Sequence, residues 1–396
     1  MKTTNISLFC QLLQIIDHHR FTEIVKFYDG DKHSKGFSCQ EQLVCLLFCQ
    51  MAQARSLREI ENGLKICEGQ LFHLGLSKAP NRSTLSYANA NRPWQIYEAC
   101  FYALLEKCQG EMQQGKTKFR FHNQLLSFDS STISLCLNLF DWAKFRQTKG
   151  AVKLHLLLDH DGYLPVFVKI TDGKTHDVNL ARGLQLPPGS IIVADRGYVD
   201  YELFQKWNQE KAFFVVRMKD NAVYGTVRQL PVLKNREVLS DSLIELTGVQ
   251  THKKYPGVLR RVVVWDEVNQ CEIVLVTNNF ALSASTIGKI YRERWQIELF
   301  FKAIKQNLKV KTFIGTSENA LYTQIWTALI SILLLKYLQY RSTASWALSN
   351  LVAVIRWNLF VHRCLWECLN NPTGIQDAGG PGDKQLELFG TASIRK

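Results

Sequence analysis

The sequence has no apolar run long enough to cross a membrane. Its longest nearly apolar stretch is residues 328–335 (ALISILLL), whereas a transmembrane helix needs about 20 such residues. We expect this stretch to lie in a buried core helix. The first apolar patch of the chain is interrupted by Gln11, Gln14 and Asp17, so it lacks the continuous apolar centre of a signal peptide. We therefore expect a cytoplasmic protein with no membrane partner.

The sequence also lacks the paired cysteines of a zinc site. Its 11 cysteines are an odd number and are scattered along the chain. Cys45/Cys49 and Cys364/Cys368 are spaced by four residues and do not form C-x-x-C pairs. We therefore expect reduced thiols, most of them buried.

Positive charge, in contrast, is abundant. The 396 residues include 48 Lys and Arg against 35 Asp and Glu, which gives a formal net charge of +13. An excess of this size favours a polyanion or an acidic membrane surface as partner, without choosing between them. The length and the 46% hydrophobic content allow a large core and two or three domains.

Residues 1 to about 118 show the pattern of helices. Apolar residues recur at spacings of three and four in residues 6–16, 40–51 and 93–107, and a short helix is expected at 21–28. Ser56 followed by Glu59 predicts a capping box. Four arginines lie near expected helix ends: Arg55, Arg58, Arg82 and Arg92. These features fit a DNA-binding bundle, and they equally fit a helical scaffold with ordinary surface arginines.

From about residue 119 the pattern changes to that of strands. Strands are expected at 125–130, 133–137, 153–159, 164–170, 190–194 and 212–216, with a helix at 200–210. Asp161-Gly162 is a hairpin turn signal. Antiparallel strands followed by alternating strand and helix indicate a ribonuclease-H-like α/β fold. In that fold, carboxylates on the first and after the fourth strand meet at one edge of the sheet.

Two aspartates occupy these strand positions. Asp129 lies within the first strand and Asp195 ends an apolar one. Burying a carboxylate there is costly unless it is paired or binds a metal; the alternative is an N-cap or turn role. Other polar residues nearby are better explained as turn or capping residues or lack ligand spacing: Asp159, Asp161, Asp172, Asp177, His155, His160 and His176.

Residues 291–305 contain no Gly or Pro and predict one unbroken helix. At about 100° per residue, four polar side chains share a stripe roughly 60° wide, with a fifth beside it. They are Tyr291, Arg294, Glu298 and Lys305, and then Lys302. The opposite face is apolar: Ile290, Ile297, Phe300, Phe301 and Ile304. The simpler interpretation is a solvated amphipathic helix with an Arg294–Glu298 pair.

The spacing Tyr-x-x-Arg-x-x-x-Glu, then six residues and Lys, resembles the YREK signature of DDE transposases of the insertion-sequence-four family. SFDSSTI, VKLHLLLDHDGYLPVFVKITDGKTHD and VADRGY resemble the blocks around the first two acids of that family. FTEIVKFYDGDKHSKGFSCQEQL, SLREIENGL and NRSTLSYANANRPW resemble its N-terminal domain. The resemblance spans nearly the whole chain and implies that Asp129, Asp195 and Glu298 are the catalytic acids.

The resemblance also implies a division into parts. Residues 1–118 would be a helical domain for transposon-end binding, and 119–345 a ribonuclease-H-like catalytic domain. A mostly β subdomain would be inserted at about 217–280, where strands are expected at 223–230, 237–246, 259–265 and 271–277. Residues 346–396 would form a C-terminal helix and a mobile tail, since the end of the chain is rich in Gly and Pro.

The implied chemistry uses two Mg²⁺ ions, with Mn²⁺ as a substitute, held by the three acids. Tyr291, Arg294, Lys305 and Lys302 would hold transposon-end phosphates. Trp265 or Tyr255 would stack on a flipped base, although both could instead pack within the subdomain.

The implied function is that of a bacterial insertion-sequence transposase close to the nucleoid. It would bind terminal inverted repeats, cleave through a hairpin and join the ends to target DNA by a cut-and-paste route, as a homodimer in the synaptic complex. Two alternatives remain: a metal-dependent nuclease without strand transfer, and a non-catalytic DNA-binding protein descended from a transposase.

Overall fold

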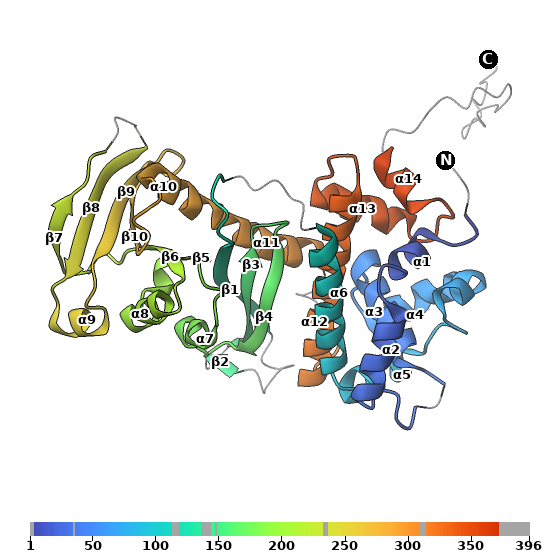
Figure 1. The fold of residues 1–396 in the computed structure, drawn as a ribbon. Coiled ribbons are helices and arrows are strands. Elements are labelled where there is room, and N and C mark those ends of the chain that lie inside the picture. The colour runs from blue at the N-terminus through green and yellow to red at the C-terminus, as the bar shows by residue number, and fades with distance from the viewer. Residues whose placement is uncertain are drawn as a thin grey trace, which may run out of the picture.

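The computed structural model describes residues 4–34, 36–112, 119–135, 144–146, 149–232, 237–308 and 314–371. Helices from both ends of the chain gather at one end of the molecule, and a mixed sheet extends from them to the other end (Figure 1). The tail predicted to be mobile lies almost wholly outside the described residues.

The first part of the chain is helical, as predicted. Its elements are α1 Leu8–Leu13, α2 His18–Phe27, α3 Cys39–Ala52, α4 Leu57–Ile66, the 3₁₀ helix η1 Glu68–Leu74, α5 Arg82–Asn91 and α6 Gln95–Met112. At α4 the predicted capping box is only half formed. Ser56 Oγ accepts the Glu59 N–H, but Glu59 Oε2 accepts from the Arg55 N–H at 2.9 Å. A full capping box joins Ser38 and Glu41 at α3.

The apolar run near residue 328 lies in helix α12 (Glu318–Arg341). By length and apolar content this helix could cross a membrane, but 89% of its most apolar window is buried inside the protein. The prediction of a core helix is therefore confirmed. Trp326 of α12 packs against Phe101 of α6, with ring centroids 5.3 Å apart.

The C-terminal helices share this core with the N-terminal ones. Helices α12, α13 (Leu348–Asn358) and α14 (Leu365–Asn370) pack with α1–α6 in one apolar cluster. Asn319 at the start of α12 donates hydrogen bonds to the carbonyls of Asn89 and Arg92. On the other side of α6, the Tyr102 hydroxyl bonds the backbone of Val168 on the sheet.

The sheet has the strand directions of the predicted fold class. Strand β1 is antiparallel to β3 and parallel to β5; β5 is parallel to β6, and β4 is antiparallel to β3. This is the ribonuclease-H-like arrangement, so the fold class is confirmed. The bounds are β1 Leu125–Leu135, β2 Lys144–Arg146, β3 Lys149–Asp159, β4 Leu164–Asp172, β5 Ile191–Ala194 and β6 Phe213–Arg217.

Two local strand predictions have different outcomes. The two short strands expected at 125–130 and 133–137 are wrong as separate elements, because β1 runs unbroken along β3 from Leu126 to Leu135; residues 136 and 137 lie outside the described ranges. The turn signal Asp161-Gly162 is confirmed. It closes the β3–β4 hairpin, with Gly162 and Tyr163 both at positive φ (75° and 53°).

The inserted β region continues the core sheet. Its strands are β7 Tyr224–Gln229, β8 Val238–Leu246, β9 Leu259–Asp266 and β10 Cys271–Thr277, with the short helix α9 Val249–Lys254. Since β10 pairs with β6, the path runs β2-β3-β1-β5-β6-β10-β9-β8-β7, with β4 beside β3. The chain therefore holds its insertion through backbone hydrogen bonds.

Helices cover both faces of the central strands (Figure 1). Helices α7 (Asp177–Gly183) and α8 (Tyr201–Gln209) pack on the face that carries Phe128 and Phe214. Helix α10 (Ala284–Glu293) packs on the face that carries Leu125 and Val193. Alternation along β1 puts Asp129 on the same face as Leu125, toward α10 and the helix that follows it.

Candidate active site

The helix predicted at 291–305 is two helices that meet at Arg294. Helix α10 ends at Glu293 and α11 spans Trp295–Asn307. The Arg294 N–H bonds the Tyr291 carbonyl, and the Ile297 N–H bonds the Arg294 carbonyl, so the bonding tightens to i→i−3 at the junction. The single-helix prediction is wrong here, but the predicted apolar face is confirmed, since all its members are buried: Ile290, Ile297, Phe300, Phe301 and Ile304.

The parallel register of β1 and β5 brings the two aspartates together. Phe128 pairs with Ala194, so the next residues of the two strands, Asp129 and Asp195, are neighbours across strands that lie about 4.8 Å apart. Asp195 precedes the short helix η2 (Arg196–Tyr198), but its side chain makes no capping bond there. The capping interpretation therefore does not account for Asp195.

The surroundings of Asp129 disfavour the ionised form of its carboxyl. Burial, with smaller contributions from the nearby Glu298 and Asp195, raises the pKa of its carboxyl to about 6, although the Ser130 N–H and Arg294 favour the ionised form. Ser130 donates to Asp129 Oδ1 at 2.8 Å. Mutual repulsion of this kind requires the three acids to lie close together.

Arg294 lies between two of these acids. Its Nη2 is 2.6 Å from Glu298 Oε1, and its Nη1 is 3.6 Å from Asp129 Oδ2. The guanidinium also lies 5.6 Å from the centre of the Tyr291 ring, and the Tyr291 hydroxyl is 3.4 Å from Asp195 Oδ1. Three members of the predicted stripe thus meet both aspartates at one place.

The remaining predicted DNA-contacting residues lie farther along these elements. Lys302 is exposed on α11, and Lys305 is half-buried near its end. Trp265 is partly buried on β9, where its backbone N–H donates to the Glu237 carbonyl. Tyr255 is only 2% exposed within the apolar cluster under α8, which agrees with its packing alternative. DNA contact by Lys302, Lys305 and Trp265 stays a prediction.

The residues assigned to turns behave as expected in most cases. Asp159 accepts the Asp161 N–H and Asp172 accepts the Thr175 N–H. Asp177 begins α7 and pairs with Lys153 at 3.1 Å. These acids make local contacts, and no contact joins them to Asp129, Asp195 or Glu298 within the described residues.

Sequence reasoning missed Tyr198. This side chain is 2% exposed and packs against Phe128, with ring centroids 5.1 Å apart. Burial raises its pKa, and the charges of Asp129, Asp177 and Asp195 raise it further. The aromatic residue three positions after Asp195 was the available signal, but spacing alone does not show that η2 turns it inward.

The carboxylates of Asp129, Asp195 and Glu298 suit a hard divalent cation, although in this structure the cation between Asp129 and Glu298 is the Arg294 guanidinium. Carboxylate oxygens are the ligands that Mg²⁺ prefers. Within the ranges that the structure describes, no three His, Cys, Asp or Glu side chains are grouped as a metal site. The guanidinium of Arg294 takes the space between Asp129 and Glu298.

Two segments of the chain match known protein families. Residues 120–334 match the family described as Transposase DDE domain, and residues 4–77 match a domain of unknown function, DUF4372. A Geobacillus stearothermophilus protein named as a probable transposase for insertion sequence element IS5377 is 31% identical, over 85% of both chains. A Sinorhizobium fredii protein named as transposase y4zB is 31% identical, over 73% of this chain and 78% of its own.

A more distant match is the transposase InsG for insertion sequence element IS4 of Escherichia coli. It is 24% identical over 39% of this chain and 36% of its own. Among solved structures, a piggyBac transposase synaptic complex with hairpin DNA is 12% identical, with a TM-score of 0.44, over 96% of this chain and 89% of that one.

The chain belongs to the DDE transposases, because the family match spans more than half of it and a relative is 31% identical over 85% of both chains. Within them it is a transposase of the insertion-sequence-four kind.

Proposed function

We propose that this transposase binds the terminal inverted repeats of its insertion sequence and moves it by a cut-and-paste route. In this proposal Asp129, Asp195 and Glu298 are the catalytic carboxylates. The observation that carries it is that Arg294 pairs with both Asp129 and Glu298, while Asp195 neighbours Asp129 across the parallel strands β1 and β5. Such a group of acids is costly to build into a fold that does not use it.

The three carboxylates would hold two Mg²⁺ ions, or Mn²⁺ in their place. Bound metal of this kind supplies an activated water or 3′-hydroxyl and a counter-charge for the leaving oxygen. Asp129 and Glu298 already face a common cation, so the space between them suits positive charge. Asp195 would complete the set from the neighbouring strand.

Arg294 would change partners when DNA binds. A guanidinium can form bidentate hydrogen bonds with a phosphate. A phosphate of the transposon end could therefore replace Glu298 and Asp129 as the partner of Arg294. Tyr291 would orient Asp195 through its hydroxyl. Lys302 and Lys305, on the following turns of α11, would contact neighbouring phosphates, and Trp265 would stack on a base of the end.

The helical domain would bind the repeats outside the catalytic domain. Two ends have to be held together for joining, so we propose a homodimer in the synaptic complex. The place of action is the bacterial cytoplasm, at the nucleoid. Hairpin formation at each end, hairpin opening and strand transfer complete the proposed sequence of steps.

The test uses donor DNA with both terminal repeats, a supercoiled target and Mg²⁺. Wild type should nick the ends, form hairpins and yield joined donor–target DNA. Asp129→Asn, Asp195→Asn and Glu298→Gln should each lose cleavage while retaining end binding in a gel-shift assay. Asp172→Asn, which changes an acid with a turn role, is the matched control and should remain active.

Each other outcome selects an alternative. Cleavage without joined product supports a nuclease, and end binding without cleavage by wild type supports a non-catalytic DNA-binding protein. Normal cleavage by any one of the three acid variants removes that residue from the site.

A further inference from the structure

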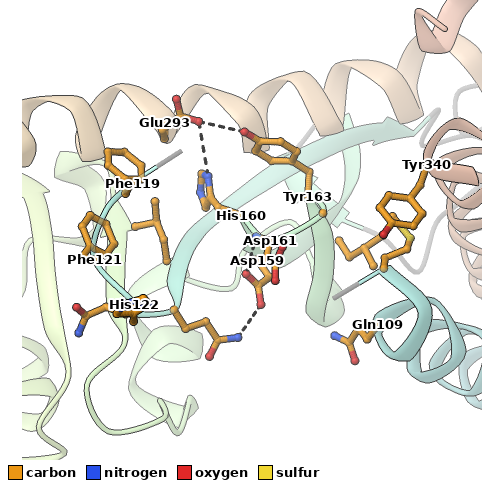
Figure 2. A pocket seen from close by; sticks show the side chains of 16 residues that line it. Gln109, Phe119, Phe121, His122, Asp159, His160, Asp161, Tyr163, Glu293 and Tyr340 are labelled. Carbon is orange, nitrogen blue, oxygen red and sulfur yellow. Dashed lines mark hydrogen bonds and ion pairs between the residues drawn. The ribbon is translucent and has the colours of Figure 1, made fainter. Parts of the chain in front are cut away.

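The junction between α10 and α11 is attached to the sheet through two adjacent side chains. Arg294 reaches Asp129, as described above. Glu293, the last residue of α10, points the other way, toward the β3–β4 turn (Figure 2). Its Oε2 accepts a hydrogen bond from the Tyr163 hydroxyl at 3.3 Å and lies 3.9 Å from His160 Nδ1.

His160 is in turn hydrogen-bonded to a side chain of β1. Its Nε2 is 2.7 Å from Ser127 Oγ, and Ser127 is fully buried. The bond between Nε2 and the serine hydroxyl can form in either tautomer of the ring, whereas the 3.9 Å between Nδ1 and Glu293 Oε2 is an ion-pair distance and not a hydrogen bond. Either state links the helix junction to the strand.

The two attachments end on one face of the same strand. Ser127 and Asp129 are two residues apart in β1, so their side chains point to the same side of the sheet. Glu293 to His160 to Ser127 forms one arm, and Arg294 to Asp129 forms the other. Both arms therefore hold the start of α11 in a fixed position relative to β1.

Packing alone does not fix Glu293. Its side chain lines a cavity of about 690 Å³, which is also bounded by the stacked rings of Phe119 and Phe121 and by Tyr340 (Figure 2). A side chain on a cavity wall lacks close neighbours on that side. The hydrogen bond from Tyr163 and the ion pair with His160 therefore help to set the direction of the Glu293 side chain.

The backbone of the junction also needs support from outside. The i→i−3 bonds at Arg294 replace the regular i→i−4 ladder, and such a stretch often marks a hinge. Glu298 lies only one turn beyond it. A small change in the angle of α11 would therefore move the Glu298 carboxylate relative to Asp129.

We propose that Glu293 and His160 are positioning residues: they hold the α10–α11 junction so that Glu298 and Arg294 lie over Asp129. This rests on the proposed role of Asp129 and Glu298 in holding metal. Neither Glu293 nor His160 touches the reacting groups in this proposal; they act through the helix.

The test compares Glu293→Ala and His160→Ala with wild type in three measurements. Cleavage of repeat-end DNA at saturating DNA should fall about 10- to 100-fold, because a misplacement near 1 Å is enough for such a loss. End affinity should be unchanged. Mn²⁺ binding to the DNA-free protein, followed by electron paramagnetic resonance, should weaken about 3- to 10-fold, a change that general destabilisation of a folded protein does not produce.

Matched variants separate positioning from folding. Glu293→Gln keeps an acceptor for Tyr163 and should recover most of the activity that Glu293→Ala loses. Gln109→Ala changes another wall of the same cavity and should resemble wild type. The double variant of Glu293 and His160 should lose no more than the worse single variant, since both belong to one chain of contacts. If the alanine variants fail to fold, Ser127→Ala tests the far end of the arm by the same three measurements.

Wild-type cleavage and Mn²⁺ affinity in the folded Glu293 and His160 variants would overturn the positioning role while leaving the proposed function intact. Inactivity of wild type itself, with end binding retained, would instead count against the proposed function. An additive double variant would overturn the single contact chain.

Discussion

The guanidinium of Arg294 lies 2.6 Å from the Glu298 carboxylate, one helical turn away. On an exposed helix such a pair contributes only a few tenths of a kcal/mol. Here Arg294 is 15% exposed and also faces Asp129, so it offsets the repulsion between two acids that would otherwise face each other. The same contact occupies the space proposed for a metal, and so links the stability of the protein to the proposed catalytic site.

Arg294→Ala should destabilise the metal-free protein. Removing one member of a largely buried ion pair costs up to about 3–5 kcal/mol, and since Glu298 is partly exposed we expect about 1–2 kcal/mol. Mg²⁺ should restore much of this loss by taking the place of the guanidinium. Thermal melting with and without Mg²⁺ measures both effects.

The matched control for that experiment is Arg292→Ala. Arg292 lies in the last turn of α10, two residues before Arg294, and pairs with Glu237. Because it is 52% exposed, we expect a small change that does not respond to Mg²⁺. Equal behaviour of the two variants would show that Arg294 does not offset the acids.

Asp129→Asn should stabilise the protein at neutral pH while abolishing cleavage. The pKa of Asp129 is raised from 3.8 to about 6, so the folded state binds the proton more tightly than the unfolded state. Wild-type stability should therefore fall as pH rises from about 4 to 6, by up to about 3 kcal/mol. Asparagine resembles the protonated acid and avoids this loss.

Urea unfolding at pH 4.5 and 7.5, without divalent metal, measures the difference. The asparagine variant should be the more stable protein at pH 7.5, and its advantage should shrink toward pH 4.5. An advantage that is absent at pH 7.5, or that grows on acidification, would be inconsistent with a raised pKa at Asp129.

Tyr291→Phe should have a mild effect. It removes a long hydrogen bond to Asp195 (3.4 Å) but keeps the ring that lies against Arg294. We expect no more than about a 10-fold loss of cleavage, corresponding to roughly 1.4 kcal/mol, and a nearly unchanged melting temperature. A loss of several orders of magnitude would mean that the hydroxyl does more than orient Asp195.

Gly288→Ala should loosen α10 from the inserted strands. A Cβ at Gly288 would lie 2.9 Å from Val264 Cγ1 on β9, so helix or strand has to shift. Overpacking of this kind costs about 1–3 kcal/mol. Adding Val264→Ala should relieve part of the cost, and calorimetry of the two single variants and the double variant would detect the coupling; strict additivity would exclude a direct clash.

Much of the site follows from local patterns. An aspartate within the apolar pattern of β1, another at the end of β5, and a polar stripe containing Glu298 were all visible in the sequence, because strand and helix periods decide which side chains share a face. Asp129 and Asp195 then meet because the parallel register makes Phe128 and Ala194 partners.

The rest depends on contacts between distant segments. No Gly or Pro marks the break in the helix at Arg294. At this break Arg294 contacts Asp129 on β1, and Glu293 contacts His160 in the β3–β4 turn. The merging of the insertion with the core sheet depends on the pairing of β10 with β6, across some 60 residues of chain. Neither feature leaves a periodic signal within its own segment.

Because β10 is hydrogen-bonded directly to β6, the inserted strands and the strands that carry the aspartates form one continuous sheet. A DNA duplex bound to the outer strands β7–β9 would therefore lie at a fixed distance from the proposed catalytic carboxylates. Adjusting that distance would require the sheet to twist or β10 to separate from β6, because these two strands (Phe213–Arg217 and Cys271–Thr277) are joined by backbone hydrogen bonds.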